Sequence, residues 1–310
     1  MARLAISVIT RNRAKHIRED LHFIAEAAQK KGIDIYIFDG STDDSTKNAV
    51  YAYINKGYSN IKYLHYIDNW ENGNIPERFI DAFMMPDTDY CWVCGDKFIV
   101  KPQNYDIVLE LVEKDYDIIT LYDKCFDGTR TFSNSSDFVD YCIVPLTHWG
   151  STIIKKSLMN KIDIRQELVD NQSFWVVKSY VKAIDKVSFS GIALHINKSQ
   201  FKIESKYVTR GGTEHTMWDT WIYNWCRLID SFPEKYKSIR SGLYSRLDKE
   251  VSLFSLKELL RQRSTNQFDI DKVTQYQKEA KRVVLLPMGI VYLIAAIPGK
   301  IVKMIYIIVK

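Results

Sequence analysis

The stretch 35–46, IYIFDGSTDDST, carries residue types that are suited to binding chemistry. An apolar run ends at Asp39, the glycine after it allows a tight turn, and Ser, Thr and Asp side chains can cap the helix that follows. We expect an exposed Asp39 carboxylate that can accept a hydrogen bond from a uracil N–H. On the neighbouring loop, Thr10 and Arg13 can reach a ribose and a diphosphate. The alternative is a capped turn that binds no ligand.

A second stretch, DYCWVCGDKFIV (89–100), combines a Cys-x-x-Cys pair with an acidic and a basic residue. Cys91 and Cys94 lie three apart on an expected strand, so they point to opposite faces, which suits one metal poorly. No second Cys/His pair with zinc-like spacing follows, and a thioredoxin-type pair would begin a helix instead of ending a strand. We expect structural thiols. His195 and His215 could contact a metal or phosphate, but for a lone histidine a structural role is the more common one.

The elements that position these residues alternate between strand and helix. Short β-rich runs at 3–9, 33–38, 61–67 and 89–94 are separated by helical patterns at about 18–32, 45–55 and 75–85. This alternation predicts an α/β fold with a mostly parallel sheet, whose ligands bind beyond the carboxyl ends of the strands. Four polar residues follow those strands and should meet at one edge: Thr10, Asp39, Asp68 and Asp96.

Beyond residue 115 the pattern changes to shorter strands. We expect strands at 117–122, 141–146, 151–156 and 186–196, with a helix at 173–183 that belongs to the same domain. An aromatic helix at 217–232 and an amphipathic one at 252–264 come next. The predicted organisation is a domain at 1–232, with a donor half (1–105) and an acceptor half (106–232), and a helical region at 233–310.

Charge is unevenly distributed along the 310 residues. The chain carries a net charge of +5, yet residues 234–310 hold 15 Lys and Arg against 7 Asp and Glu, a balance of +8, which leaves −3 for residues 1–233. The basic region therefore indicates an anionic surface as partner, and no nucleic-acid motif accompanies it. Five cysteines and an N-terminal apolar run too short for a signal peptide indicate a reducing compartment.

The tail 281–310 is apolar with basic flanks, and Pro287 and Pro298 interrupt it. Its longest uncharged run is near the minimum that spans a bilayer. Two short segments lying in one leaflet fit better, with lysines facing anionic headgroups, and a buried helical hairpin is the alternative. We expect a peripheral or monotopic protein at the cytoplasmic face of a membrane.

Four blocks of sequence together resemble the GT-A fold of family 2 glycosyltransferases of the bacterial surface-polysaccharide type. They have the family's order over about the first 105 residues: ISVITRNRAKHIREDL, IYIFDGSTDDST, ENGNIPERFIDAF and YCWVCGDKFIVKP. The resemblance implies a Rossmann-like GT-A domain in which the donor nucleotide-sugar is held by Thr10, Arg13, Asp39, Ser41, Arg78, Asp96 and Lys97.

The resemblance also places Asp96 in the metal loop, where the family usually has two or three aspartates. Here one carboxylate stands beside Lys97, so two outcomes stay open. Asp96 with phosphates and water holds Mg²⁺ or Mn²⁺, or Lys97 itself neutralises charge on the leaving diphosphate.

Acceptor-side residues follow from the same resemblance. The family's catalytic carboxylate precedes an aromatic helix, where this chain has Asp170 followed by Asn171, so Asp170 is the predicted base and Glu167 its substitute. Both could instead only cap the next helix. Trp149 could stack on a sugar and Gly150 would allow close approach of the backbone.

The implied activity is that of an inverting glycosyltransferase, of hexosyltransferase type, which moves a sugar from a nucleoside-diphosphate donor, with a UDP-sugar as the expected one, to a glycan or glycolipid acceptor. A membrane-associated tail favours a lipid-linked acceptor, as in capsule and other polysaccharide biosynthesis. The alternatives are a nucleotidyltransferase, although TRNRAKH lacks the phosphate-binding glycines, and a non-catalytic glycosyltransferase-like subunit. No pattern in the sequence predicts an oligomeric state.

Overall fold

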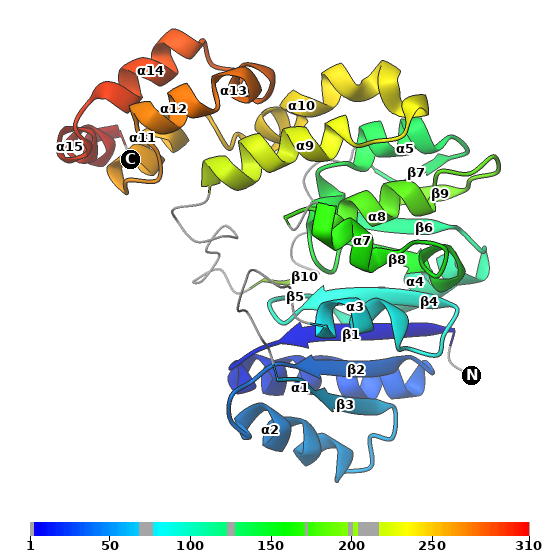
Figure 1. Ribbon diagram of the computed structural model, residues 1–310. Helices are drawn as coiled ribbons and strands as arrows, with labels where there is room; N and C mark the ends of the chain where they lie inside the picture. The colour runs from blue at the N-terminus through cyan, green and yellow to red at the C-terminus, as the bar shows by residue number, and fades with distance from the viewer. Residues whose placement is uncertain are drawn as a thin grey trace. The chain divides into compact units, whose positions relative to one another are not determined.

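The structure, a computed structural model, describes residues 3–67, 77–122, 128–170, 173–197, 201–203 and 217–309 (Figure 1). The chain divides into two compact units. The first contains Met1–Gln172 and Ser179–Lys206, and the second contains Ser173–Lys178 and Tyr207–Lys310. The predicted boundary between residues 232 and 233 separates a catalytic domain from a membrane-associating region, and this division of roles stays a prediction.

The first unit is built on a mixed sheet. The strands are β1 (Leu4–Thr10), β2 (Asp34–Asp39), β3 (Ile61–His65), β4 (Tyr90–Gly95), β5 (Phe98–Val100), β6 (Ile118–Tyr122), β7 (Arg130–Phe132), β8 (Thr152–Lys155), β9 (Gly191–His195) and β10 (Phe201–Ile203).

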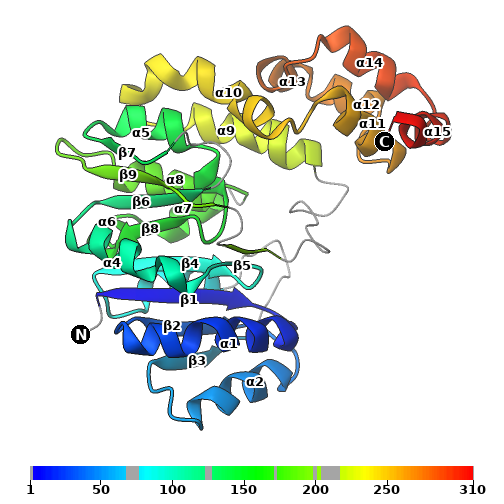
Figure 2. The same ribbon diagram turned by 180° about the vertical axis from the view of Figure 1, so that it is seen from behind.

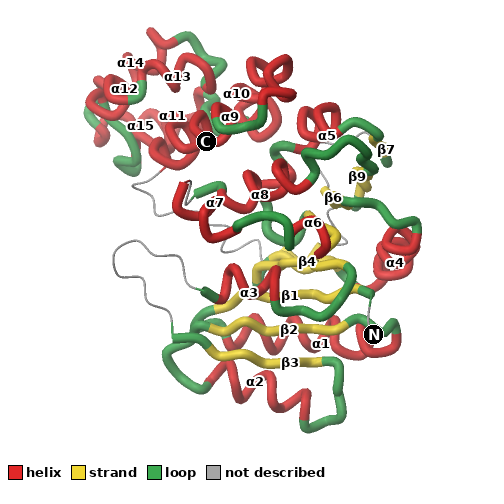
Figure 3. Tube along the Cα trace, turned by 45° about the vertical axis from the view of Figure 1, so that its right-hand side comes forward, coloured by secondary structure: helices red, strands yellow, loops and turns green. Residues whose placement is uncertain are grey.

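Eight of these strands form one sheet in the order β3-β2-β1-β4-β8-β6-β9-β7, and β5 and β10 pair in a second, antiparallel sheet. The run β3-β2-β1-β4, seen side by side in Figure 3, is parallel throughout. β8 is antiparallel to both its neighbours, β6 and β9 are parallel, and β7 is antiparallel. The predicted α/β class is confirmed, and its first four strands along the chain are parallel.

Helices cover both faces of this sheet. They are α1 (Ala14–Lys30), α2 (Ser45–Ile54), α3 (Arg78–Met84), α4 (Tyr105–Glu113), α5 (Ser135–Cys142), α6 (Lys156–Met159), α7 (Ile164–Asp170) and α8 (Trp175–Ala183), the last divided between the two units.

The main core lies between the sheet and the helices α1 and α4, which cover one of its faces. α3 lies on the opposite face (Figure 1, Figure 2). α1 turns Ile17, Leu21 and Ile24 toward β1, because apolar residues three and four apart share one side of a helix. Leu4, Ile6 and Val8 alternate along β1 and meet them, as period-two spacing requires.

One predicted strand is wrong. Residues 141–146 are the end of α5 and a 3₁₀ turn, Pro145–Thr147. The Asn134 side chain accepts hydrogen bonds from the backbone N–H of Ser136 (2.7 Å) and Asp137 (3.3 Å), so it caps α5 and starts a helix that runs into the apolar residues. A short apolar run does not by itself distinguish a strand from a buried helix end.

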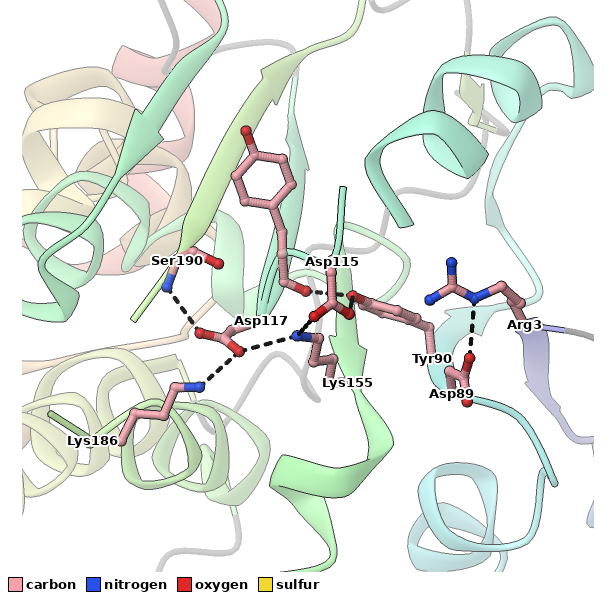
Figure 4. Close-up of polar contacts among 9 residues, drawn as sticks. Arg3, Asp89, Tyr90, Asp115, Asp117, Lys155, Lys186 and Ser190 are labelled. Atoms are coloured by element: carbon pink, nitrogen blue, oxygen red, sulfur yellow. Dashed lines mark hydrogen bonds and ion pairs between the residues drawn. The ribbon is translucent and has the colours of Figure 1, made fainter. Parts of the chain in front are cut away.

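A charged network closes the amino edge of the sheet (Figure 4). Asp117, directly before β6, accepts from Lys186 Nζ at 2.7 Å and from the backbone N–H of Ser190 at 2.9 Å. Lys155 Nζ lies 3.5 Å from Asp117 and 2.8 Å from Asp115. The network joins the starts of β6 and β9 to the end of β8.

The second unit is helical. A π-helical turn, Asp219–Asn224, precedes α9 (Trp225–Asp230), α10 (Lys237–Val251), α11 (Leu256–Ser264), α12 (Ile270–Gln275), α13 (Gln277–Val283), α14 (Met288–Ala296) and α15 (Gly299–Val309).

The prolines divide the apolar tail, as predicted. Pro287 precedes α14 and Pro298 separates α14 from α15, while α15 packs on α11 and α14 packs on α11 and α12. In the part of the chain that the structure describes, each helix is too short or too polar to cross a bilayer.

Candidate functional site

The register of the parallel strands brings three of the predicted site residues to one edge. Thr10 and Asp39 are the last residues of β1 and β2 and face each other as Cα partners. Asp96 follows β4, whose Gly95 is the partner of Ile9 on the other side of β1. The expectation that they meet at the carboxyl edge is confirmed for these three. Asp68, the fourth, lies outside the described residues.

The expected exposure of Asp39 is wrong, because its side chain is fully buried. One carboxylate oxygen accepts from the backbone N–H of Ser41 at 2.9 Å and from the Ser41 hydroxyl, and the other accepts from Tyr63 OH at 2.8 Å. Burial and this hydrogen bond raise the pKa of Tyr63, so the phenol stays protonated and donates. Asp39 therefore fixes the β2–α2 turn and the edge strand β3.

Asp96 is the centre of the second cluster. Its Oδ2 accepts from Thr10 Oγ1 at 2.8 Å, and its Oδ1 accepts from Arg13 Nη1 at 2.6 Å. The Asp96 side chain is 3% exposed, whereas 45% of the Arg13 side chain is exposed. A buried carboxylate needs such charge-assisted bonds, so Arg13 holds Asp96 while much of its own side chain faces solvent.

Asn12, which the sequence analysis missed, shapes the loop that carries Arg13. Its backbone is left-handed (φ 53°), a conformation that Asn tolerates better than most residues. Its N–H donates to Ser41 Oγ at 2.8 Å, and its side-chain Oδ1 accepts from the Thr42 N–H at 2.9 Å. The β1–α1 loop is thereby tied to the β2–α2 loop. An Asn inside a short β–α loop was the available signal.

A cavity of about 370 Å³ opens beside Arg13 at the beginnings of α1 and α2. Helix starts have N–H groups without partners in the helix and favour anions, and at α2 the Asp43 carboxylate already accepts from one of them, the N–H of Ser45, at 2.8 Å. The residues that line the cavity are Asn12, Arg13, Ala14, Lys15, His16, Asp43, Ser45 and Thr46.

Arg78 and Trp149 belong to one aromatic cluster. Arg78 is buried at the start of α3, with its guanidinium 4.5 Å from the centre of the Phe79 ring. The Phe79 ring lies 5.8 Å from the ring of Trp149, centre to centre. A Cβ built on Gly95 would be 3.7 Å from the Cβ of Trp149, so the half-buried Trp149 starts beside Gly95, the last residue of β4, which directly precedes Asp96.

Gly150 lets the chain turn immediately after Trp149, because its φ of 89° suits glycine alone without strain. Its N–H donates to the carbonyl of Val93 at 2.8 Å, and its own carbonyl accepts from Trp92 Nε1 at 2.8 Å. These bonds fix the Trp149 loop to β4.

The two candidate bases on α7 differ in environment. Glu167 is buried and forms an ion pair with Lys182. Asp170, at the end of α7, is exposed and accepts from Gln166 Nε2 at 2.9 Å. Asn171, the next residue, lies outside the described residues. The base position stays a prediction, and the geometry favours Asp170 as the accessible carboxylate.

The cysteine pair has the properties of structural thiols. Cys91 and Cys94 are free and buried. Burial raises the pKa of Cys91 to about 12 and that of Cys94 well above its usual value, so both stay protonated and unreactive. His195 ends β9 with an exposed side chain, and His215 lies outside the described residues.

The described residues do not fit a divalent-metal site as they stand. Within them, no three His, Cys, Asp or Glu side chains gather closely enough to hold a metal. Asp96, the predicted ligand, already accepts a hydrogen bond at each oxygen, and one donor is a cation. Lys97, which follows it, is partly exposed. Hard cations need several oxygen ligands, so one saturated carboxylate is a poor start.

Comparison with solved structures identifies the fold. No protein-family model matches the chain, and no curated protein matches its sequence. The chain is similar to S. aureus TarS 1–349, with a TM-score of 0.57 at 15% identity over 98% of this chain and 88% of that one. A second match is the same fragment in complex with UDP-GlcNAc, with a TM-score of 0.52 at 13% identity over 98% and 89%.

A third match is the mannosyltransferase PcManGT from Pyrobaculum calidifontis in complex with GDP-Man and Mn²⁺, with a TM-score of 0.53 at 12% identity over 97% and 87%. At these identities the likeness establishes the fold. The chain has the GT-A glycosyltransferase fold that its sequence blocks imply.

Proposed function

We propose that the protein is an inverting glycosyltransferase that moves a sugar from a nucleoside-diphosphate donor, UDP-linked, to a glycan acceptor. The observation that carries the proposal is the cluster of Thr10, Arg13, Asp39 and Asp96 at the carboxyl edge of β1, β2 and β4, where open α/β sheets bind their ligands. TarS with UDP-GlcNAc and the mannosyltransferase with GDP-Man support a nucleotide-sugar as donor in this fold.

Each predicted donor residue has a separate task. Asp39 and Ser41 hold the turn at which the nucleoside binds. Thr10 and Asp96, which are joined by a hydrogen bond, line the site beside this turn. Arg13, Lys97 and Arg78 supply positive charge for the diphosphate. The mannosyltransferase structure contains Mn²⁺, but here Asp96, the predicted ligand, already accepts from Thr10 and Arg13, so it could hold a divalent cation only if Arg13 moved away.

The chemistry requires one base on the acceptor side. As the acceptor hydroxyl attacks C1 from the face opposite the leaving group, the new C–O bond forms, the bond from C1 to the diphosphate breaks, and the base takes the hydroxyl proton. We assign this role to Asp170, because Glu167 is buried against Lys182. Trp149 offers a ring on which a sugar can stack.

The donor reaction can be tested without knowing the acceptor, because glycosyltransferases slowly hydrolyse their donors. Purified full-length protein is incubated with UDP-GlcNAc, UDP-glucose and UDP-galactose, and UDP release is measured. We expect release from at least one donor, and loss of release in Asp170→Asn while nucleotide binding persists. Glu167→Gln is the matched control and should keep its activity per folded molecule. Absence of release from every donor would favour the non-catalytic subunit.

A lipid-linked acceptor and a membrane location belong to the same proposal. Among the side chains that the structure describes, six apolar ones are exposed on and before α14 and α15, although each helix also buries apolar residues such as Val291 and Val302. Lys281, Lys300 and Lys303 are exposed among them, and no acidic residue follows Glu279. The exposed apolar residues, which we call the tail surface, are Leu285, Ile290, Leu293, Ile301, Met304 and Ile307.

An apolar surface with basic neighbours suits the cytoplasmic leaflet, where anionic headgroups meet lysines and apolar side chains enter the acyl boundary. We expect the full-length protein to float with vesicles of phosphatidylcholine and phosphatidylglycerol, and less with phosphatidylcholine alone. Leu293→Asp should reduce flotation. Val187→Asp, which changes a fully exposed valine of the first unit, is the control. Equal flotation of both variants and the unchanged protein would contradict the proposal.

A further inference from the structure

We infer that Arg13, anchored by Asp96, is the built-in cation of the donor site, so that nucleotide binding does not require a divalent metal. This inference rests on the proposed donor site and goes beyond it, because it assigns the source of the charge that meets the diphosphate.

The first support is that both oxygens of the Asp96 carboxylate already accept hydrogen bonds. A divalent cation would need at least one of its oxygens, yet Oδ2 accepts from Thr10 and Oδ1 accepts from Arg13. The carboxylate is 3% exposed, so a metal could reach it only after the Arg13 guanidinium had moved away. Removing one partner of a buried charge pair is costly.

The second support is the position of the guanidinium. Arg13 presents five N–H donors in a planar fork, and the bond to Asp96 uses Nη1. The side chain is 45% exposed and also lines the cavity at the beginnings of α1 and α2. One end of the fork is therefore fixed to the protein, while the side chain also borders open space large enough for an anionic group. A fixed, planar cation of this kind suits phosphate oxygens.

The third support is that the loop is preorganised. Asn12 holds a left-handed conformation directly before Arg13, and its bonds to Ser41 and Thr42 fix the loop to the next β–α turn. A cation that is held before the ligand arrives loses little entropy on binding, which is also the advantage of a bound metal.

The experiment measures the affinity of the full-length protein for UDP and GDP by calorimetry, in EDTA and in Mn²⁺. We expect the dissociation constant of the preferred nucleotide to agree within about twofold between the two conditions. Arg13→Met should weaken binding in EDTA by about tenfold or more, as expected for loss of a charge-assisted bond. Arg13→Lys, which keeps the charge and loses the fork, should fall between.

Arg18→Met, the same change at an exposed position of α1, controls for the loss of one positive charge. The melting temperature of each unliganded variant verifies that it is folded. Binding that is strong in Mn²⁺ and lost in EDTA would overturn this inference and leave the glycosyltransferase proposal standing, as would unchanged affinity in Arg13→Met. Failure of both nucleotides to bind under either condition would overturn the proposed donor site and this inference together.

Discussion

Both edges of the sheet bury an aspartate beside a cation, but the two sites are built differently. At the amino edge, Asp117 is 6% exposed and its partners are Lys186, Lys155 and a backbone N–H, all within the network of Figure 4. At the carboxyl edge, Asp96 is equally buried, but its cation, Arg13, lies on a loop and is nearly half exposed. An aspartate whose partners all lie in one network, as for Asp117, serves stability. A buried aspartate that holds an exposed cation, as Asp96 does, can serve a ligand.

The largest expected effect is at the carboxyl edge and concerns activity. Asp96→Asn keeps an acceptor for Thr10 but removes the charge that holds Arg13. UDP release from the donor should fall by about 100-fold or more, which is typical for loss of one preorganised electrostatic group. The free energy of unfolding should fall by only about 1 kcal/mol, because the amide oxygen can accept one of the two bonds, the Thr10 hydroxyl can turn to accept from the amide NH₂, and Arg13 is exposed enough to be hydrated. Donor hydrolysis and urea denaturation measure the two effects, and a variant that loses stability but keeps its rate would reverse the comparison.

The next effect is at the amino edge and concerns stability. Asp117→Asn leaves Lys186 and Lys155 without their shared carboxylate and should lower the free energy of unfolding by about 3 kcal/mol. Activity per folded molecule should not change. Asp89→Asn at the same edge is the matched control, because its pair with Arg3 is exposed on both sides and should be worth less than about 1 kcal/mol. Equal losses in the two variants would mean that burial does not set the strength of this network.

A smaller effect concerns the second carboxylate of the donor edge. Tyr63→Phe removes one hydrogen bond to Asp39 and should cost about 1 kcal/mol of stability, with a few-fold loss of nucleotide affinity as the β2–α2 turn loosens. Tyr66→Phe removes a bond of the same length, to Asp81, and is the control. It should cost similar stability without changing nucleotide affinity. Calorimetric titration of both variants tests whether Asp39 acts on the ligand or only on the fold.

The carboxyl edge was predictable because it depends on order along the chain. Apolar runs that end at Thr10, Asp39 and just before Asp96, separated by helical patterns, require parallel strands, and parallel strands gather their carboxyl ends at one edge. What the sequence could not supply is the partner of each side chain. The burial of Asp39 depends on Tyr63, which arrives from β3, and only the folded register brings it within reach.

Three other features of the structure also could not be predicted from the local sequence. The run 141–146 has no feature that separates a strand from the end of a helix, and the deciding group, the Asn134 cap, lies outside it. The saturation of Asp96 is invisible in CGDK, because Thr10 and Arg13 precede it by more than eighty residues. Elements of three residues such as β5, β7 and β10 are too short to show a period.

The smallest effect tests whether the amino edge is a single network or a buried pair with exposed additions. Asp115 accepts from Lys155, and this hydrogen bond, opposed by partial burial, holds the pKa of Asp115 below its usual 3.8. A lowered folded-state pKa means that the ionised carboxylate stabilises the fold above about pH 4, and that this contribution is lost as the pH falls through the folded-state pKa.

Asp115→Asn keeps the left-handed backbone (φ 63°), which Asn tolerates, and removes only the charge. Because the side chain is 67% exposed, urea denaturation at pH 7 should show a loss of a few tenths of a kcal/mol, which shrinks near pH 3.5 or in about 1 M salt. A loss as large as that of Asp117→Asn, unchanged by salt, would show that Asp115, Lys155 and Asp117 act as one unit, and the contrast between buried and exposed partners would then not hold at this edge.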